Sequence, residues 1–151
     1  MKKIILLFCF WFMSGCSGYQ PIFSSKDSAF YIENIESLND DKIAYQINSR
    51  LSGYKIKDVN KKNYNLKISS KKNINVISRD SKGNSQLYKM LINVSIAVIS
   101  DQKLIKKINL QESFNYSNSK NKFNLNQYKK EIEENLISKI SEELILRLQI
   151  L

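Results

Sequence analysis

The 151-residue sequence contains no histidine, two cysteines, one proline and four glycines. Without histidine it cannot form the Ser–His and Cys–His sets that activate nucleophiles. Its few glycines form no phosphate-binding loop, and no residues have metal-ligand spacing. No pair of carboxylates is placed as a hydrolase would need it. We therefore expect a protein that is not an enzyme and that uses no metal or other cofactor.

The N-terminus has the organisation of a secretory signal peptide. Lys2 and Lys3 precede the uncharged run "IILLFCFWFM" (4–13), which is too short to span a bilayer as a helix. Met13-Ser14-Gly15-Cys16 then resembles a bacterial lipobox, in which the peptide is cut before the cysteine and the cysteine is acylated, for example by palmitate. We expect residues 1–15 to be a lipoprotein signal peptide. The alternative is an uncleaved anchor with an incidental cysteine.

Lipidation of Cys16 would leave the mature protein without a free thiol, because Cys9 is removed with the signal peptide. That excludes a disulfide, a cysteine–zinc site and a cysteine nucleophile. Residues 16–29 are small and polar and include one proline, which is typical of a tether. We expect a lipidated tether over 16–29, membrane attachment through acylated Cys16, and one folded domain over 30–151.

The chain is basic, with a formal charge of +10. Lysine, asparagine, isoleucine and serine are all frequent, and all four can be encoded by A/T-rich codons. The charge is therefore weak evidence for a nucleic-acid partner, and an exported protein rarely meets one, so we expect none. Near an anionic membrane, by contrast, each lysine contributes about 1 kcal/mol of attraction.

Hydrophobic periodicity predicts the secondary structure. Residues 30–35 are typical of a short strand, and 38–53 of a helix that Asn39 caps and Gly53 closes in a left-handed conformation. Three long half-buried strands with period two follow, and a polar loop (117–124) leads to a final amphipathic helix. The alternating strand residues run over 64–76, 88–98 and 104–116, and the apolar stripe of the helix runs from Leu125 to Leu151.

The element order β-α-β-β-β-α predicts an α+β fold, a two-layer sandwich with two helices packed on a four-stranded mixed β-sheet. Because the strands are long, we expect one hairpin to project beyond the helices. Glu112 and Lys106 share the apolar face of the last strand, and we expect both to reach water at a strand end or an uncovered edge.

Basic residues are the best candidates for function. Lysine and arginine pair with phosphate oxygens, whereas solvated surface lysines are the simpler interpretation of any single position. Arg79 and Lys82 fall at the predicted hairpin tip. Lys71 and Lys72 interrupt the strand before this tip. The other candidates follow the next turn or lie in the loop before the last helix: Lys103, Lys106, Lys107, Lys120 and Lys122.

Several motifs together resemble the alphaproteobacterial LptE-type lipopolysaccharide-assembly lipoproteins. Each motif alone matches the family only loosely, but together they cover nearly the whole mature chain. The motifs are "CSGYQPIF", "YNLKIS", "VISRDSKGNSQLYKM", "LINVSIAVIS", "ESFNYS" and "EELILRL". The chain departs from the family by an extra residue, Ser17, after the cysteine. It also has lysine and asparagine where relatives tend to have arginine and alanine.

This resemblance implies a lipid-anchored protein on the periplasmic face of the outer membrane. Such proteins plug the LptD β-barrel translocon, help it to assemble, and take part in lipopolysaccharide transport to the outer leaflet. Basic residues at the hairpin tip and before the last helix bind lipopolysaccharide in this family. Arg79 matches the tip position, Lys82 lies beside it, and Lys122 is an approximate match in the loop. The alternative function is an envelope lipoprotein adaptor for another periplasmic assembly, associated with peptidoglycan or a pilus.

Overall fold

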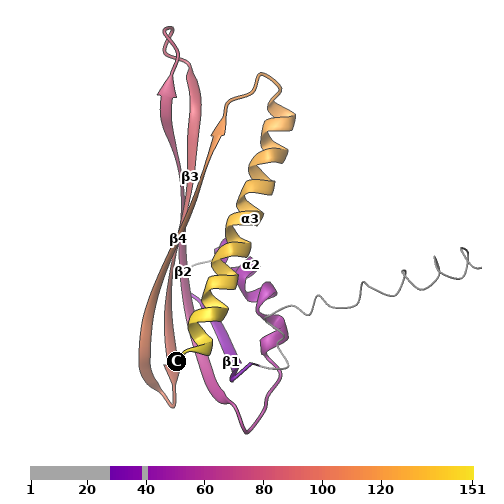
Figure 1. Ribbon diagram of the computed structural model, residues 1–151, viewed down its shortest axis with the longest axis vertical. Coiled ribbons are helices and arrows are strands. Elements are labelled where there is room, and N and C mark those ends of the chain that lie inside the picture. The colour runs from indigo at the N-terminus through magenta and orange to yellow at the C-terminus, as the bar shows by residue number, and fades with distance from the viewer. Residues whose placement is uncertain (1–27, 39–40) are drawn as a thin grey trace, which may run out of the picture.

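The computed structural model describes residues 28–38 and 41–151, and it has the predicted two-layer α+β architecture (Figure 1). The elements are β1 (Phe30–Ser37), α2 (Lys42–Arg50), the short 3₁₀ turn η3 (Ser52–Tyr54), β2 (Lys62–Arg79), β3 (Ser85–Ser100), β4 (Lys103–Ser117) and α3 (Lys122–Gln149). The predicted signal peptide, Cys16 and nearly all of the predicted tether lie outside the described residues.

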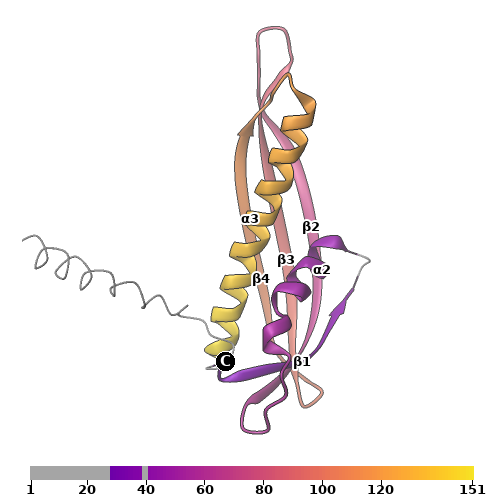
Figure 2. The same cartoon turned by 90° about the vertical axis from the view of Figure 1, so that its right-hand side faces the viewer.

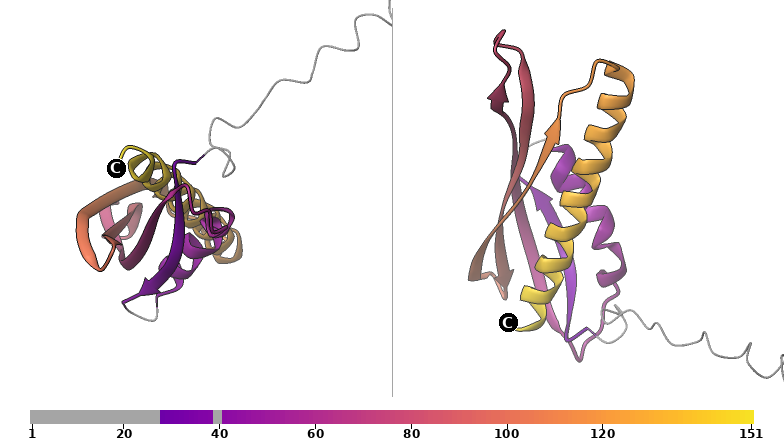
Figure 3. Two further views of the ribbon diagram at one scale, coloured as in Figure 1. Left: turned by 90° about the horizontal axis from the view of Figure 1, so that it is seen from below. Right: turned by 45° about the horizontal axis from the view of Figure 1, so that its top comes forward.

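The four strands form an open mixed sheet in the order β1-β2-β3-β4. β1 pairs with β2 in parallel, and β2–β3 and β3–β4 are antiparallel pairs. Both helices cover the same face of the sheet, as the view from below shows (Figure 3). A tight turn joins β3 to β4, and in it Asp101 and Gln102 both have positive φ angles, of 49° and 62°. Such angles are those of the two-residue turns that match strand twist.

The core lies between the sheet and the helices, where the period-two residues of the strands meet α3. Alternation places every second strand residue on this face, and a one-residue slip would turn them all to solvent. The sheet contributes Leu66, Ile68, Ile92, Ile96, Val98, Ile108 and Leu110, among others. The helices contribute Ile43, Ile47, Ile137, Ile140, Leu144 and Leu148.

Helix α2 is shorter than the predicted 38–53, and both predicted ends are wrong. It begins after Asp41, whose side chain caps Ile43 N at 2.9 Å, while Asn39 lies outside the described residues. At the other end Gly53 does not adopt a left-handed conformation but lies within η3. The 3₁₀ turn brings Tyr54 back over Phe30, where the rings stack at 5.4 Å. If the α-helix continued, Tyr54 would not reach Phe30. The burial of these two rings therefore explains why α2 ends before Gly53.

Asp41 also joins α2 to the sheet, since its second carboxylate oxygen accepts hydrogen bonds from Ser70 N at 3.0 Å and from Ser70 Oγ. We expect Asp41→Ala to lower the free energy of unfolding by about 2 kcal/mol, because it removes a helix cap and leaves two donors without an acceptor. Urea denaturation of the full chain measures this loss.

Glu36→Ala is the matched control, because Glu36 makes an exposed ion pair with Lys67 at 3.0 Å, and such pairs contribute under about 1 kcal/mol. Equal urea midpoints for the two variants would contradict the structural role of Asp41.

The long β2–β3 hairpin rises above the start of α3, as predicted (Figures 1 and 2). Ile74 and Val76 lie on its upper part and are 44% and 39% exposed, although they continue the core-facing series of β2. At the edge of the sheet, Lys106 is exposed and Glu112 half-buried, so the expectation that both reach water is confirmed.

Helix α3 begins at Lys122, three residues before the predicted stripe, because the Asn121 side chain caps Phe123 N and Asn124 N at 3.1 Å. Its buried residues follow the predicted stripe except at Tyr128 and at Leu151, which lies beyond the helix and is half-buried. Tyr128 is 44% exposed, and it lies with Phe114 of β4 in an open groove at the side of the helix.

Candidate functional site

Four of the predicted basic residues, Arg79, Lys82, Lys120 and Lys122, lie in or beside two segments at one end of the molecule, which we call the distal end, whereas Lys71 and Lys72 lie midway along β2 and Lys103, Lys106 and Lys107 lie in the first part of β4. The distal end consists of the β2–β3 turn (80–84) and the loop before α3 (118–121), which lie at the top of Figure 1. These segments are more than thirty residues apart in the sequence. Their proximity is therefore a product of the fold.

Asp80 organises the β2–β3 turn. Its Oδ1 accepts hydrogen bonds from Lys82 N at 2.9 Å and Asn84 N at 2.8 Å, and its Oδ2 accepts one from Asn84 Nδ2 at 3.1 Å. Gly83 closes the turn with a φ of +84°, a conformation that costs glycine little. The Arg79 guanidinium donates to Gly83 O at 2.9 Å. The turn therefore has a defined shape, from which the Lys82 side chain extends at the exposed tip.

The carboxylate of Asp80 is committed to this turn. The side-chain hydrogen bond from Asn84, followed by its backbone hydrogen bond, lowers the pKa of Asp80 below its ordinary value. The group is thus ionised at neutral pH, and donors of the turn face its oxygens. Asp80 is also the only acidic residue in the segments 79–89 and 117–124 of the sequence, so the basic side chains there outnumber it.

The loop before α3 is fastened to the base of the hairpin by Asn118. Its backbone N donates to Gln86 O at 2.7 Å, and its Nδ2 donates to Ser85 O at 2.8 Å. The side-chain oxygen of Asn118 accepts from Lys122 Nζ at 3.3 Å. One asparagine thus determines where the loop lies and holds the ammonium group of Lys122 beside the hairpin.

The two segments enclose a shallow depression of about 560 Å³. Its lining is polar and carries two cations, Lys120 and Lys122. The hairpin side consists of Asp80, Asn84, Ser85 and Gln86, and the loop side of Ser117, Asn118 and Ser119. Amide and hydroxyl groups beside ammonium groups form a surface suited to phosphate or sugar oxygens.

The structure thus brings Lys122 to the hairpin, but it does not bring all three predicted residues into one depression. Lys122 lines it, together with Lys120. Arg79 and Lys82 lie on the turn above, where Arg79 is hydrogen-bonded to Gly83 O. The distal end therefore presents cations at two levels, the tip and the depression below it.

A cluster of two tyrosines and a lysine that the sequence did not predict lies below the distal depression. Tyr88 and Tyr116 are cross-strand partners whose rings stack at 5.4 Å, and Lys129 Nζ lies 5.9 Å from each ring centre. The Tyr116 hydroxyl is buried without a hydrogen-bond partner among the described residues. Burial raises the pKa of this hydroxyl, and the electrostatic effect of Tyr88 raises it further. The signal available in the sequence was the matching parity of the two tyrosines, which places them on one face.

The described residues show neither a metal-binding group nor a membrane span. In 28–38 and 41–151 no three His, Cys, Asp or Glu side chains lie close enough together to hold a metal ion. Within these same ranges no helix has the length and apolarity needed to cross a bilayer.

The fold is shared with bacterial lipoproteins. Rare lipoprotein B from Shewanella oneidensis matches with a TM-score of 0.60 and 14% identity over 78% of this chain and 91% of that one. A minor lipoprotein from Acinetobacter baumannii gives 0.60 and 12% over 80% and 90%, and a putative lipoprotein from Caulobacter crescentus gives 0.55 and 12% over 77% and 88%. No protein-family model and no curated protein sequence matches the chain.

Proposed function

We propose that this protein is an LptE-like lipoprotein of the outer membrane, anchored through acylated Cys16 and facing the periplasm. In this role it plugs an LptD-type β-barrel, helps the barrel to assemble, and contacts lipopolysaccharide phosphates with basic residues of its distal end. The lipobox supports the anchor, and the fold, which bacterial lipoproteins share, supports the class of protein.

The observation that carries the lipopolysaccharide role is the attachment of the 118–121 loop to the hairpin by Asn118. It gathers Lys120 and Lys122 below a tip that carries Arg79 and Lys82. Phosphate groups on a glycolipid would find several ammonium or guanidinium donors within one small surface, and charge-assisted hydrogen bonds are stronger than neutral ones.

Apolar side chains accompany these cations. Ile74, Val76 and Ile77 are between 39% and 46% exposed on the upper part of the hairpin, and Phe123 is 76% exposed at the start of α3. A ligand that combines phosphates with acyl chains matches such a surface better than a free phosphate does, because it also removes apolar side chains from water.

Affinity purification of the tagged full chain from detergent extracts tests the assembly role. We expect a large outer-membrane β-barrel of the LptD kind to copurify, and depletion of the protein to reduce both correctly assembled barrel and surface lipopolysaccharide. Recovery of peptidoglycan-associated or pilus proteins in place of the barrel would favour the adaptor function. Unchanged barrel and lipopolysaccharide levels after depletion would refute the proposal.

A further inference from the structure

The end of the molecule opposite the hairpin tip, which we call the proximal end, exposes bulky apolar side chains. It contains the loop between η3 and β2 (55–61), the β3–β4 turn and the end of α3, which lie together at the bottom of Figures 1 and 2. Ile56 and Val59 are 76% and 87% exposed, and Leu104 and Ile105 are 54% and 50% exposed. Scattered single apolar residues are normal on a surface, whereas several at one end indicate a contact surface.

The η3–β2 loop and the start of β4 meet across one depression of about 590 Å³. Val59 and Lys62 line it from the η3–β2 side, Ile105 lines it from β4, and Leu151 completes it from the end of the chain. Val59 and Ile105 therefore belong to one surface, which Ile56 extends because it lines a neighbouring depression with Val59.

Lysines surround these apolar side chains. Lys55 and Lys57 alternate with Ile56 in the loop, Lys62 follows at the start of β2, and Lys103 begins β4; all four are exposed. The acidic residues in this part are Asp58 and Asp101, and Asp58 already pairs with Lys61 at 3.9 Å. The proximal end is thus both apolar and basic.

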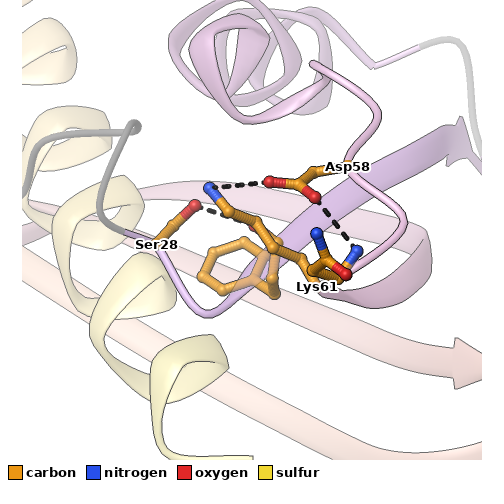
Figure 4. A network of polar contacts seen from close by, with 5 residues as sticks. Ser28, Asp58 and Lys61 are labelled. Atoms are coloured by element: carbon orange, nitrogen blue, oxygen red, sulfur yellow. Dashed lines mark hydrogen bonds and ion pairs between the residues drawn. The ribbon is translucent and has the colours of Figure 1, made fainter.

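The described chain starts at this surface. Ser28 lines a second depression together with Ile56 and Val59, and it lies beside the segment that carries Asp58 and Lys61 (Figure 4). Twelve peptide steps (28 − 16) separate Ser28 from Cys16, which limits their separation to about 40 Å. A lipid on Cys16 therefore keeps the proximal end near the bilayer and raises its local concentration there.

We propose that the proximal end is a second membrane contact, which binds the surface of a bilayer containing anionic phospholipids. Its lysines face the lipid phosphates, and Ile56, Val59 and Ile105 enter the headgroup region. The contact rests on the proposed lipid anchoring for its location, but not on lipopolysaccharide binding or on a barrel partner. A lipid surface fits these residues better than a protein does, because lysine is depleted in protein interfaces and attracted to anionic lipid.

A fluorescent label on a single cysteine tests the contact in the full chain. The chain carries Cys9→Ser with either Val59→Cys or, as a reference at the distal tip, Lys82→Cys. It is produced in cells that process lipoproteins, labelled, and reconstituted into phosphatidylethanolamine vesicles with or without phosphatidylglycerol. Nitroxide-labelled lipids quench a label that reaches the bilayer. Mass spectrometry counts the labels, so failure of Cys16 acylation is recognised as a second label and is distinguished from failure of the contact.

We expect quenching at Val59 to exceed that at Lys82 at least about three-fold in vesicles with phosphatidylglycerol, since apolar side chains and lysines act together at such surfaces. Replacement of Lys57 and Lys62 by glutamate should reduce the fraction of Val59 labels that the bilayer quenches at least about five-fold. Lys71→Glu with Lys139→Glu, an equal charge change at exposed residues midway along the molecule, should leave it unchanged.

Equal, weak quenching at both positions in an anchored protein would overturn the proposal. So would a Val59 label that stays in water on vesicles and becomes shielded only when an outer-membrane protein is added, because the surface would then be a protein contact.

Discussion

Replacing Lys82 and Lys122 with glutamate is expected to weaken lipopolysaccharide binding by the full chain about 100-fold. Each charge-assisted contact contributes about 1.5 kcal/mol, so loss of two corresponds to roughly 3 kcal/mol. The two residues represent the two levels of the distal end, the turn and the depression. Titration with fluorescent lipopolysaccharide at fixed ionic strength measures the change.

The control for this experiment is Lys71→Glu with Lys139→Glu, which changes the net charge equally at exposed residues far from the distal end. It should retain near-normal binding. If both double variants lose the same affinity, net charge and not the distal end governs binding. If the Lys82/Lys122 variant is folded and binds normally, these lysines are solvated surface residues.

Replacing Ile140 with alanine is expected to lower the free energy of unfolding by about 3 kcal/mol. Ile140 is fully buried in the middle of α3, and removal of a large side chain from such a place costs its transfer free energy and leaves a cavity. A domain of ordinary stability has only about 5–15 kcal/mol to lose. The urea midpoint should fall by about 2 M for a slope of about 1.5 kcal/mol per molar.

Leu146→Ala provides the comparison, since Leu146 lies on the same helix and is 41% exposed. Its midpoint should fall much less. Similar midpoints for the two variants would show that α3 does not pack on the sheet through Ile140 as described.

The sheet could be predicted well because each strand has one face in the core and one in water. Period two follows directly from that arrangement, and Leu66, Ile92 and Ile108 all fall on the buried side. The ends of α2 could not be predicted, since they depend on partners distant in sequence. Asp41 is held by Ser70, and Tyr54 by Phe30, and neither contact leaves a local signal.

The sequence predicted which basic residues belong to the candidate site, but it did not predict how they are arranged in space. Arg79 and Lys82 follow from the hairpin pattern, whereas the nearness of Lys122 depends on hydrogen bonds from Asn118 to the backbone of Ser85 and Gln86. Asparagine is common in polar loops, so its anchoring role has no distinctive sequence signal. Lys120 joined Lys122 in the depression for the same reason.

Helix α3 runs from the distal depression to the proximal end without interruption, and this gives the molecule a definite length. Its 28 residues correspond to about 42 Å. A bilayer measures about 40–45 Å including its headgroups. Helix α3 is therefore about as long as a bilayer is thick. When the proximal end rests at one surface of the bilayer and α3 stands along the membrane normal, the depression with Lys120 and Lys122 stands near the level of the other surface, and the hairpin tip stands beyond it.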